Sequence, residues 1–221
     1  TGYGVVYFAQ NMLEDRGESL AGKKCAVSGA GNVAIYCCEK LYHVGATPVT
    51  VSDSRGMIHD DKGINVEALK QVKEVERASL TRYAELVPGA TYTPVSAYPQ
   101  GRNAVWSIPC FAAFPCATQN ELNLADADVL LKKGCKCVSE GANMPSTLDA
   151  TNAFLKAGIA YGPAKAANAG GVATSQLEMQ QNAGMQSWTF DTVDGKLKDI
   201  MGNIFRNASE TAKEFNNPGN L

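Results

Sequence analysis

The sequence lacks the features that would place it in a membrane or on a nucleic acid. No apolar run is long enough to cross a bilayer, and no signal peptide is visible. The net charge is −2 and no cluster of basic residues stands out. We therefore expect neither membrane nor nucleic acid as a partner. A hydrophobic content of 45% and a charged content of 19% are typical of a globular domain with a substantial core.

Histidine is scarce, and the cysteines do not form a recognisable ligand set. Only His43 and His59 are present, and neither has a partner at ligand spacing. Cys135 and Cys137 are expected on one face of a strand, but no second Cys or His pair completes a tetrahedral site. The seven cysteines are an odd number, which argues against a disulfide framework. We expect no metal site, and a reducing, cytoplasmic compartment.

A glycine-rich turn lies between a short apolar run and a helical segment. Residues 25–27 are apolar, Gly29 and Gly31 follow, and a helix is expected over 32–44. With Ala34 in the third position, the spacing is G-x-G-x-x-A. This spacing is typical of turns that hold the pyrophosphate of a dinucleotide at a helix N-terminus. An ordinary strand–helix turn would show the same spacing, so the motif alone does not decide.

Apolar runs and helical patterns alternate along the chain. Such alternation predicts an α/β fold with a doubly wound, mostly parallel, Rossmann-like sheet and helices on both faces. No boundary divides residues 1–221. The proline-rich stretch 87–109 is expected to be mostly loop and short strand. Strands are expected at 25–27, 47–52, 111–114, 135–138 and 159–161, and helices at 3–15, 32–44, 65–76, 121–133, 147–157, 168–184 and 191–215.

Polar clusters follow the expected strands at the point where each strand ends. Right-handed crossovers bring the carboxyl ends of parallel strands to one edge, where a doubly wound fold binds its ligand. This convergence favours a dinucleotide site over an ordinary turn. The clusters are residues 28–32, 53–55, 116–120, 140–143 and the segment after Tyr161.

The second strand ends in residues that bear on the choice of cofactor. Asp53 lies 24 residues after Gly29, where a carboxylate accepts hydrogen bonds from an adenosine ribose. The alternative is an aspartate that only forms a turn. Ser54 and Arg55 would accommodate a 2′-phosphate, which favours NADP over NAD. Further basic candidates, unless they only form a solvated helix face, are Lys70, Lys73, Arg77 and Arg82.

Amide and hydroxyl side chains in the second half suit a small polar ligand. Thr118 and Asn143 lie at strand ends, within reach of a carboxamide or a ribose. Asn168, Val172 and Ser175 fall on one face of the penultimate helix at i, i+4 and i+7. An amide, an apolar side chain and a hydroxyl fit a ligand with an aliphatic stem. The alternative is a helix cap, a core valine and a serine bonded to its own backbone.

Six motifs in sequence order together resemble hexameric glutamate dehydrogenase of the glutamate, leucine, phenylalanine and valine dehydrogenase family. The pattern is most similar to the NADP-dependent members and extends over nearly the whole chain. The motifs are Thr1–Gly4, Ser28–Ala34, Ser52–Ser54, Pro115–Glu121, Glu140–Pro145 and Lys165–Ser175.

The resemblance implies reversible oxidative deamination of L-glutamate to 2-oxoglutarate and ammonia by a homo-hexamer, with hydride passing to the nicotinamide. It implies that Asn32 lies near the pyrophosphate, that Ser175 bonds the substrate's side-chain carboxylate and that Val172 lines its stem. The residues expected to contact the cofactor are Thr1, Ser28, Gly29, Gly31, Asn32, Val33, Asp53, Ser54, Ala117, Thr118, Asn143 and Asn168.

The resemblance also implies that the catalytic residues lie elsewhere. The family's catalytic lysine and its partner aspartate belong to a substrate domain that would precede Thr1, and a further helix would follow Leu221. We therefore expect these residues to form the cofactor domain alone. Two alternatives stay open: a dinucleotide-binding module without activity of its own, and a leucine, valine or phenylalanine dehydrogenase. Ser175 argues against the latter, because an apolar substrate offers its hydroxyl no partner.

Overall fold

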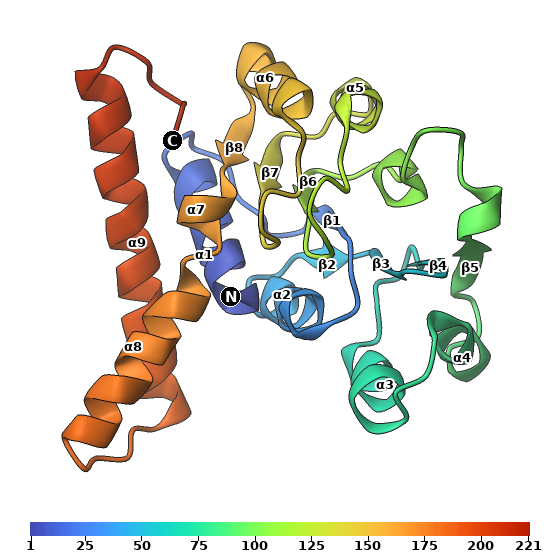
Figure 1. Ribbon diagram of the computed structural model, residues 1–221, viewed down its shortest axis with the longest axis horizontal. Coiled ribbons are helices and arrows are strands. Elements are labelled where there is room, and N and C mark those ends of the chain that lie inside the picture. Colours follow the sequence, from blue (N-terminus) through green and yellow to red (C-terminus); the bar gives the residue numbers. More distant parts are fainter.

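Two sheets form the frame of the molecule (Figure 1). The structure is a computed structural model that describes residues 1–221. The larger sheet is parallel, with strand order β2-β1-β6-β7-β8, and the smaller is antiparallel, with order β3-β4-β5. The strands are β1 (Lys24–Val27), β2 (Thr47–Pro48), β3 (Thr50–Asp53), β4 (Gly56–His59), β5 (Thr91–Pro94), β6 (Ala112–Phe114), β7 (Cys137–Ser139) and β8 (Ala160–Gly162).

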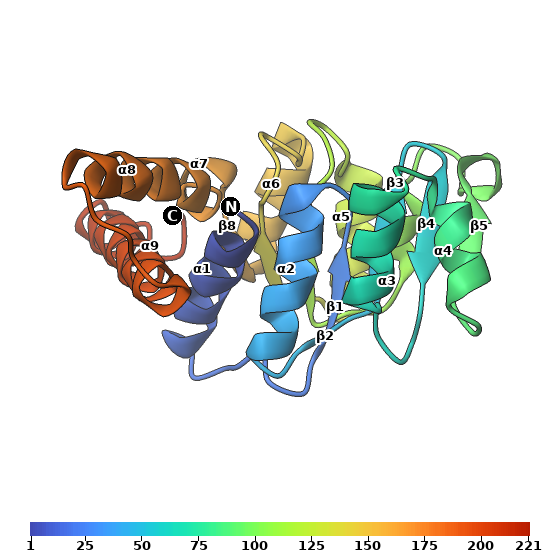
Figure 2. The same ribbon diagram turned by 90° about the horizontal axis from the view of Figure 1, so that it is seen from below.

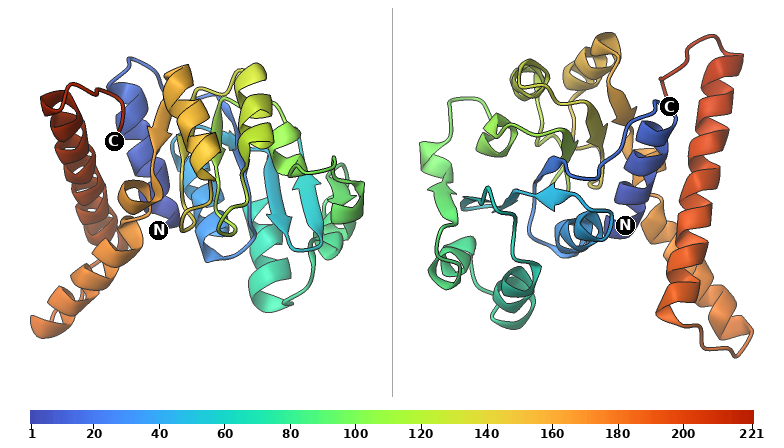
Figure 3. Two further views of the ribbon diagram at one scale, coloured as in Figure 1. Left: turned by 45° about the horizontal axis from the view of Figure 1, so that its top comes forward. Right: turned by 180° about the vertical axis from the view of Figure 1, so that it is seen from behind.

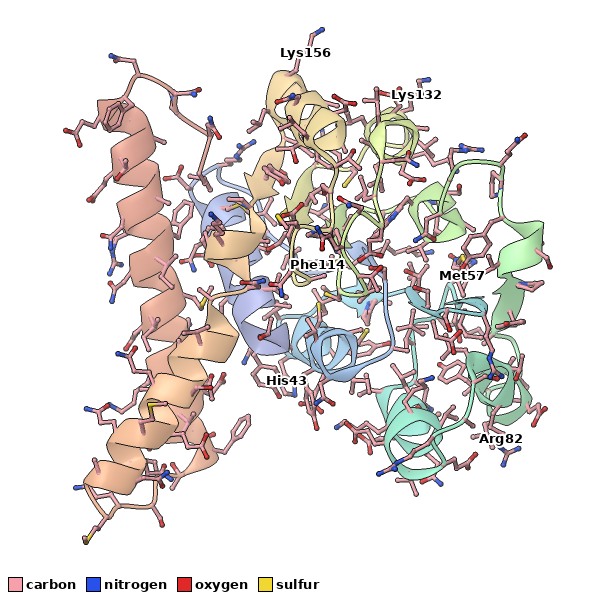
Figure 4. The ribbon with its side chains drawn as sticks, viewed as in Figure 1. His43, Met57, Arg82, Phe114, Lys132 and Lys156 are labelled. Atoms are coloured by element: carbon pink, nitrogen blue, oxygen red, sulfur yellow. The ribbon has the colours of Figure 1, made fainter.

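Successive residues of the parallel strands enter two different cores. In β1, Cys25 and Val27 belong to the core on one face, and Ala26 belongs to the core on the other. In β6, Phe114 belongs to the first of these cores and Ala113 to the second. Phe114 lies in the middle of the molecule (Figure 4). This is the period-2 alternation of a strand, here with apolar residues on both sides. Both faces must therefore be covered, which confirms the predicted doubly wound arrangement.

Helices cover the parallel sheet on both faces. On one face, α1 (Gly2–Glu14) packs beside α2 (Asn32–His43), and α9 (Phe190–Glu214) lies outside α1 (Figure 3). On the other face, α5 (Leu124–Lys132) packs against α6 (Leu148–Ala157). None of the helices combines the length and the apolar composition that crossing a bilayer requires. The other helices are α3 (Val66–Lys70), which continues into a π-helical turn (Gln71–Val75), α4 (Leu80–Leu86), α7 (Ala164–Ala167) and α8 (Gly170–Ala183).

The predicted single strand over 47–52 is wrong, because the chain divides after Pro48. Only β2 pairs with β1. At Thr50 the side chain takes the place of backbone hydrogen bonds to β1. Its Oγ1 accepts the Val27 N–H at 2.9 Å and donates to the Val27 carbonyl at 3.0 Å. The backbone of β3 is then free to pair with β4 instead. Both β4 and α4 lie where the sequence predicted no regular element.

Smaller differences concern element ends. Strand β7 starts two residues later than predicted, so Cys135 precedes it, and α5 starts at Leu124 behind the capping residue Asn123. The proline-rich stretch 87–109 holds strand β5 and two 3₁₀ turns, Val95–Ala97 and Ala104–Ser107, as expected of loop and short strand. Helix α6 is capped by Thr147, whose side chain accepts the Ala150 N–H.

We expect Thr50→Val to lower the free energy of unfolding by about 1–3 kcal/mol. The substitution keeps the shape of the side chain but leaves the buried Val27 N–H and carbonyl without their partner. Denaturant unfolding measures the loss. Thr91→Val, at an exposed position of β5, is the matched control and should change stability little. Equal stabilities of the two variants would show that the Thr50 hydroxyl does not hold the division between the sheets.

Candidate functional site

The turn between β1 and α2 requires glycine at position 29 for two independent reasons. Gly29 has a φ of +85°, in the left-handed region that favours glycine. A Cβ atom there would lie 2.7 Å from the carbonyl oxygen of Cys116. The Gly29 N–H also donates to Ser52 Oγ at 2.9 Å. The turn is thus fixed both to the segment after β6 and to β3.

Gly31 keeps the space in front of α2 open. It is the N-cap residue, with a φ of −90°, and a Cβ atom there would meet nothing within 4 Å. Because it has no capping side chain, the first amide groups of α2 and the positive end of the helix are free to meet an anion. Ala34 is fully buried in the core below. The turn therefore has the space and the donors that a pyrophosphate needs.

A cavity of about 760 Å³, here called the glycine-turn cavity, opens in front of this turn. Ser28 does not face it: the residue is fully buried, and its Oγ accepts the Cys116 N–H at 2.9 Å. Ser28 therefore supports the cavity wall from behind. The predicted cofactor residues that do line the cavity are Gly29, Gly31, Asn32, Val33, Asp53, Ser54, Ala117 and Thr118.

Asp53 is already engaged by the protein. Its Oδ1 accepts the N–H groups of Arg55 at 2.9 Å and Gly56 at 3.3 Å, as in the turn-forming alternative. Its Oδ2 accepts the Leu80 N–H at 3.2 Å and lies 3.4 Å from Lys73 Nζ. These contacts offset much of the negative charge at this end of the cavity. The predicted bond to a ribose stays a prediction.

Lys73 is the one cationic side chain that lines the glycine-turn cavity. It belongs to the π-helical turn, an irregularity frequent at functional sites. Arg55, the guanidinium first considered for a 2′-phosphate, is exposed and lies outside the lining. Arg82 points away from α4 at the rim of the molecule, where it pairs with two glutamates (Figure 4). Of the basic candidates, only Lys73 is placed to meet a phosphate in this cavity.

A second cavity of about 720 Å³, here called the α8 cavity, adjoins the first. The two share Val33 and the residues 116–118, so this segment forms a common wall. Figure 2 shows α7, α8 and the start of α2 along one side of the molecule. The α8 cavity thus gathers residues from both ends of the chain. Its remaining predicted residues are Thr1, Asn143, Asn168, Val172 and Ser175.

Asn168 is not on the same helix as Val172 and Ser175, contrary to the prediction. It ends α7, and α8 starts only at Gly170. The Asn168 Nδ2 donates to Asn143 Oδ1 at 2.9 Å, so the two amides meet at the cavity. The three residues nevertheless line one hollow, although the helical spacing that grouped them is interrupted.

The glycine pair that opens α8 allows a close approach to the start of α1. A Cβ atom at Gly170 would lie 3.0 Å from the Gly4 Cα, and one at Gly171 would lie 2.2 Å from Thr1 Oγ1. A close neighbour therefore explains why two glycines stand at the start of a helix, where they are otherwise unfavourable. The contact holds Thr1 at the edge of the α8 cavity.

The α8 cavity has little capacity for acid–base chemistry. Apart from the Cys116 thiol, its lining contains only amides, hydroxyls, glycines and apolar side chains. Such groups bind and orient a ligand, but they are not the carboxylates, imidazoles or amines that commonly transfer protons. The cavity is therefore a binding surface.

Glu121 is a site residue that sequence reasoning missed. Its Oε1 accepts the N–H groups of Ala117 at 2.9 Å and Thr118 at 3.3 Å, and its side chain lines the glycine-turn cavity. Its Oε2 is buried without a hydrogen-bond partner. Burial raises the pKa of Glu121 to about 7, against the lowering effect of the nearby Ser28 hydroxyl and the two amides. The polar run 116–120 pointed to the segment, but not to the carboxyl group that holds it.

A third, smaller hollow of about 360 Å³ lies between α1, α2 and α9. Its two carboxylates are already paired: Asp194 lies 2.9 Å from Lys40 Nζ and accepts the Tyr7 hydroxyl, and Glu39 pairs with Lys70. No free charge is left there to recognise a ligand. The cysteines form no site either, since all seven are free and buried and no group of metal-ligating side chains is present.

Comparison with known proteins supplies independent findings. The family profile described as Glutamate/Leucine/Phenylalanine/Valine dehydrogenase matches residues 1–220. The NADP-specific glutamate dehydrogenase of Helicobacter pylori is 60% identical over 221 residues, which are all of this chain and 49% of that protein. The NAD(P)-specific glutamate dehydrogenase of Xylanibacter ruminicola is 49% identical over 97% of this chain and 47% of its own length.

The chain is also similar to a solved structure of a glutamate dehydrogenase. The crystal structure of Plasmodium falciparum glutamate dehydrogenase superposes with a TM-score of 0.93 at 44% identity, over 99% of this chain and 46% of that one. The chain thus spans about half the length of the curated relatives it matches.

We expect Gly31→Ala to weaken NADPH binding by at least about tenfold while the protein stays folded. The added methyl group enters the open space in front of α2 and meets no protein atom, so it obstructs the ligand rather than the fold. Fluorescence titration measures the affinity.

Gly195→Ala on α9, where a Cβ atom is also free of contacts, is the control and should bind as the parent does. Gly29→Ala should instead lose stability, because of its clash with Cys116. Unchanged NADPH affinity in Gly31→Ala would place the phosphates elsewhere.

Proposed function

The chain belongs to the Glutamate/Leucine/Phenylalanine/Valine dehydrogenase family, and from this premise we propose that it holds the cofactor of an NADP-dependent glutamate dehydrogenase. The reaction proposed for the whole protein is the reversible oxidative deamination of L-glutamate to 2-oxoglutarate and ammonia. The observation that carries the proposal is the pair of adjoining cavities with a common wall, whose linings contain all the predicted cofactor and substrate residues except Ser28. The relatives' names support the choice of glutamate and NADP.

In this proposal the glycine-turn cavity takes the adenosine and pyrophosphate half of the dinucleotide. The open space at Gly31 and the first amides of α2 receive the pyrophosphate. Asp53 and Ser54 face the ribose. The bound nicotinamide supplies the hydride acceptor or donor of the reaction. Thr1, Thr118 and the Asn143–Asn168 amide pair orient that ring from the α8 cavity.

The substrate lies in the same cavity, against α8. Ser175 donates its hydroxyl to the side-chain carboxylate of glutamate, and Val172 lies along the two methylene groups. The exposed Val172 side chain, 77% accessible, has room for such a contact. A hydroxyl at Ser175 supports glutamate over leucine, valine or phenylalanine, whose apolar side chains would leave it unpaired.

Proton transfer is assigned to groups outside these 221 residues. No side chain in the lining of the α8 cavity is a carboxylate, amine or imidazole that could deprotonate the substrate or activate water. In the proposal this chain is therefore the cofactor domain, which positions the hydride partners. The homo-hexamer and the cytoplasmic location remain predictions.

Two observations support NADP over NAD. Lys73 lines the cavity and pairs with Asp53, the residue proposed to face the ribose from which a 2′-phosphate would extend. The relatives include proteins named NADP-specific, although one is named NAD(P)-specific. A cation facing the 2′-phosphate would discriminate between the two cofactors, and Lys73 also neutralises the carboxylate of Asp53.

We expect Lys73→Gln to weaken NADPH binding by about tenfold, because it removes a cation and leaves the Asp53 charge opposed to the 2′-phosphate. NADH affinity should stay the same or rise, since a ribose hydroxyl donates to that carboxylate. Fluorescence titrations with both nucleotides measure the ratio. Arg55→Gln is the matched control. An unchanged ratio of NADPH to NADH affinity in Lys73→Gln would show that Lys73 does not contribute to the choice between the two cofactors.

We expect Ser175→Val, in the protein with its substrate domain, to lower kcat/KM for glutamate by about 10- to 100-fold. The loss corresponds to about 1.5–3 kcal/mol for a hydrogen bond to a charged group. Ser175→Thr keeps the hydroxyl and is nearly the same shape as valine, so it should retain most of the activity. Equal rates for the valine and threonine variants would show that the hydroxyl does not bind the carboxylate.

A further inference from the structure

The wall shared by the two cavities is held by one buried carboxyl group. We propose that Glu121 is a positioning residue for the dinucleotide, which fixes the segment 116–118 and carries a proton when the cofactor's phosphates are bound. This inference rests on the proposed function, because the negative charges that favour the proton are those of the dinucleotide.

The positioning role follows from the contacts of segment 116–118. Its Ala117 and Thr118 N–H groups both point to Glu121 Oε1. On its other side, the Cys116 N–H donates to the buried Ser28 Oγ, and the Cys116 carbonyl lies against Gly29. The segment is thus held between the glycine turn and Glu121. Without an acceptor at Glu121, two amides would turn toward other partners and change the wall of both cavities.

Whether Glu121 carries a proton depends on the surroundings of its other carboxyl oxygen, Oε2. Glu121 Oε2 is buried and makes no hydrogen bond of normal geometry, and the nearby Ser28 hydroxyl is the one side chain that favours its charged form, so that form is not fully compensated. The same burial places the Glu121 pKa at about 7 in the free chain. The like charge of Asp126, at the start of α5, contributes to this raised pKa. Glu121 therefore changes its charge in the neutral range.

No cation is placed to hold Glu121 in its charged form. Lys73, the only cationic side chain in the cavity lining, is paired with Asp53, and Arg102 acts on the carboxyl group of Asp126. The phosphates of a dinucleotide would add negative charge to the same cavity and raise the Glu121 pKa further. The other titratable groups that line the cavity are Glu74, Tyr98 and Cys116.

The rise of the Glu121 pKa on binding decides in which direction the NADPH affinity changes with pH. A pKa that is higher in the complex than in the free chain means that binding takes up a proton. The affinity for NADPH is then highest well below pH 7, and it falls as the pH rises through about 7, the pKa of Glu121 in the free chain. For a rise of one unit in the complex, the NADPH Kd increases about fivefold between roughly pH 6 and pH 8.

Calorimetric titration of the chain with NADPH tests this. Titrations in two buffers of different protonation enthalpy give the number of protons taken up at about pH 7.5. On binding NADPH, the parent should take up a fraction of a proton more than Glu121→Gln does. Glutamine has the shape of the protonated acid but does not titrate. At about pH 8, Glu121→Gln should bind NADPH about fivefold more tightly than the parent does, and at about pH 6 the two should bind alike. Glu210→Gln, at an exposed position of α9, is the control and should behave as the parent does.

The positioning role is tested by Glu121→Ala, which removes the acceptor altogether. Its NADPH affinity should fall at least about tenfold across the pH range, while Glu121→Gln retains the parent's low-pH affinity. The 2′-phosphate itself titrates near pH 6, but it contributes equally to every variant.

The possible failures are distinct. A parent chain that binds no NADPH at any pH would overturn the proposed function, and this inference with it. A parent that binds NADPH, with the same proton uptake and pH profile in Glu121→Gln, would overturn the inference alone. Parent-like affinity in Glu121→Ala would remove the positioning role.

Discussion

The close approach of Gly29 to the segment after β6 is the constraint on which the site depends. A side chain at Gly29 would collide with the Cys116 carbonyl, so only glycine lets the ends of β1 and β6 meet. Because the 116–118 segment rests on this turn, it can form one wall of both cavities. The same contact brings the positive end of α2 to the edge of the sheet. Packing between two strand ends therefore sets where charge and hydrogen-bond donors face a ligand.

The two cavities differ in their electrostatics, and that difference indicates a division of labour. The glycine-turn cavity contains a helix N-terminus, a lysine–aspartate pair and a carboxyl group with a pKa of about 7. It is suited to phosphates and to cofactor choice. The α8 cavity has neutral polar groups beside an apolar wall. It is suited to orienting a small ligand.

The sequence predicts the parts of the fold that depend on local pattern. A continuous apolar run such as Cys25, Ala26 and Val27 indicates a strand buried on both faces, and the glycine spacing indicates the turn after it. The second sheet escaped prediction because a single hydroxyl, on Thr50, replaces a backbone ladder. Lys73 faces the cavity from a π-helical turn that the sequence did not indicate, and Glu121 matters through amides that only the folded chain brings to it. These are tertiary effects without a periodic signal.

Hydrogen exchange of the chain with and without NADPH tests the central claim most directly. If the adjoining cavities hold the dinucleotide, saturating NADPH protects backbone amides in the peptides that cover 29–34 and 116–120. The groove between α5 and α6, which is a comparable hollow on the other side of the sheet, should exchange as before. Protection confined to that groove, or saturable binding that leaves 29–34 and 116–120 unprotected, would contradict the account.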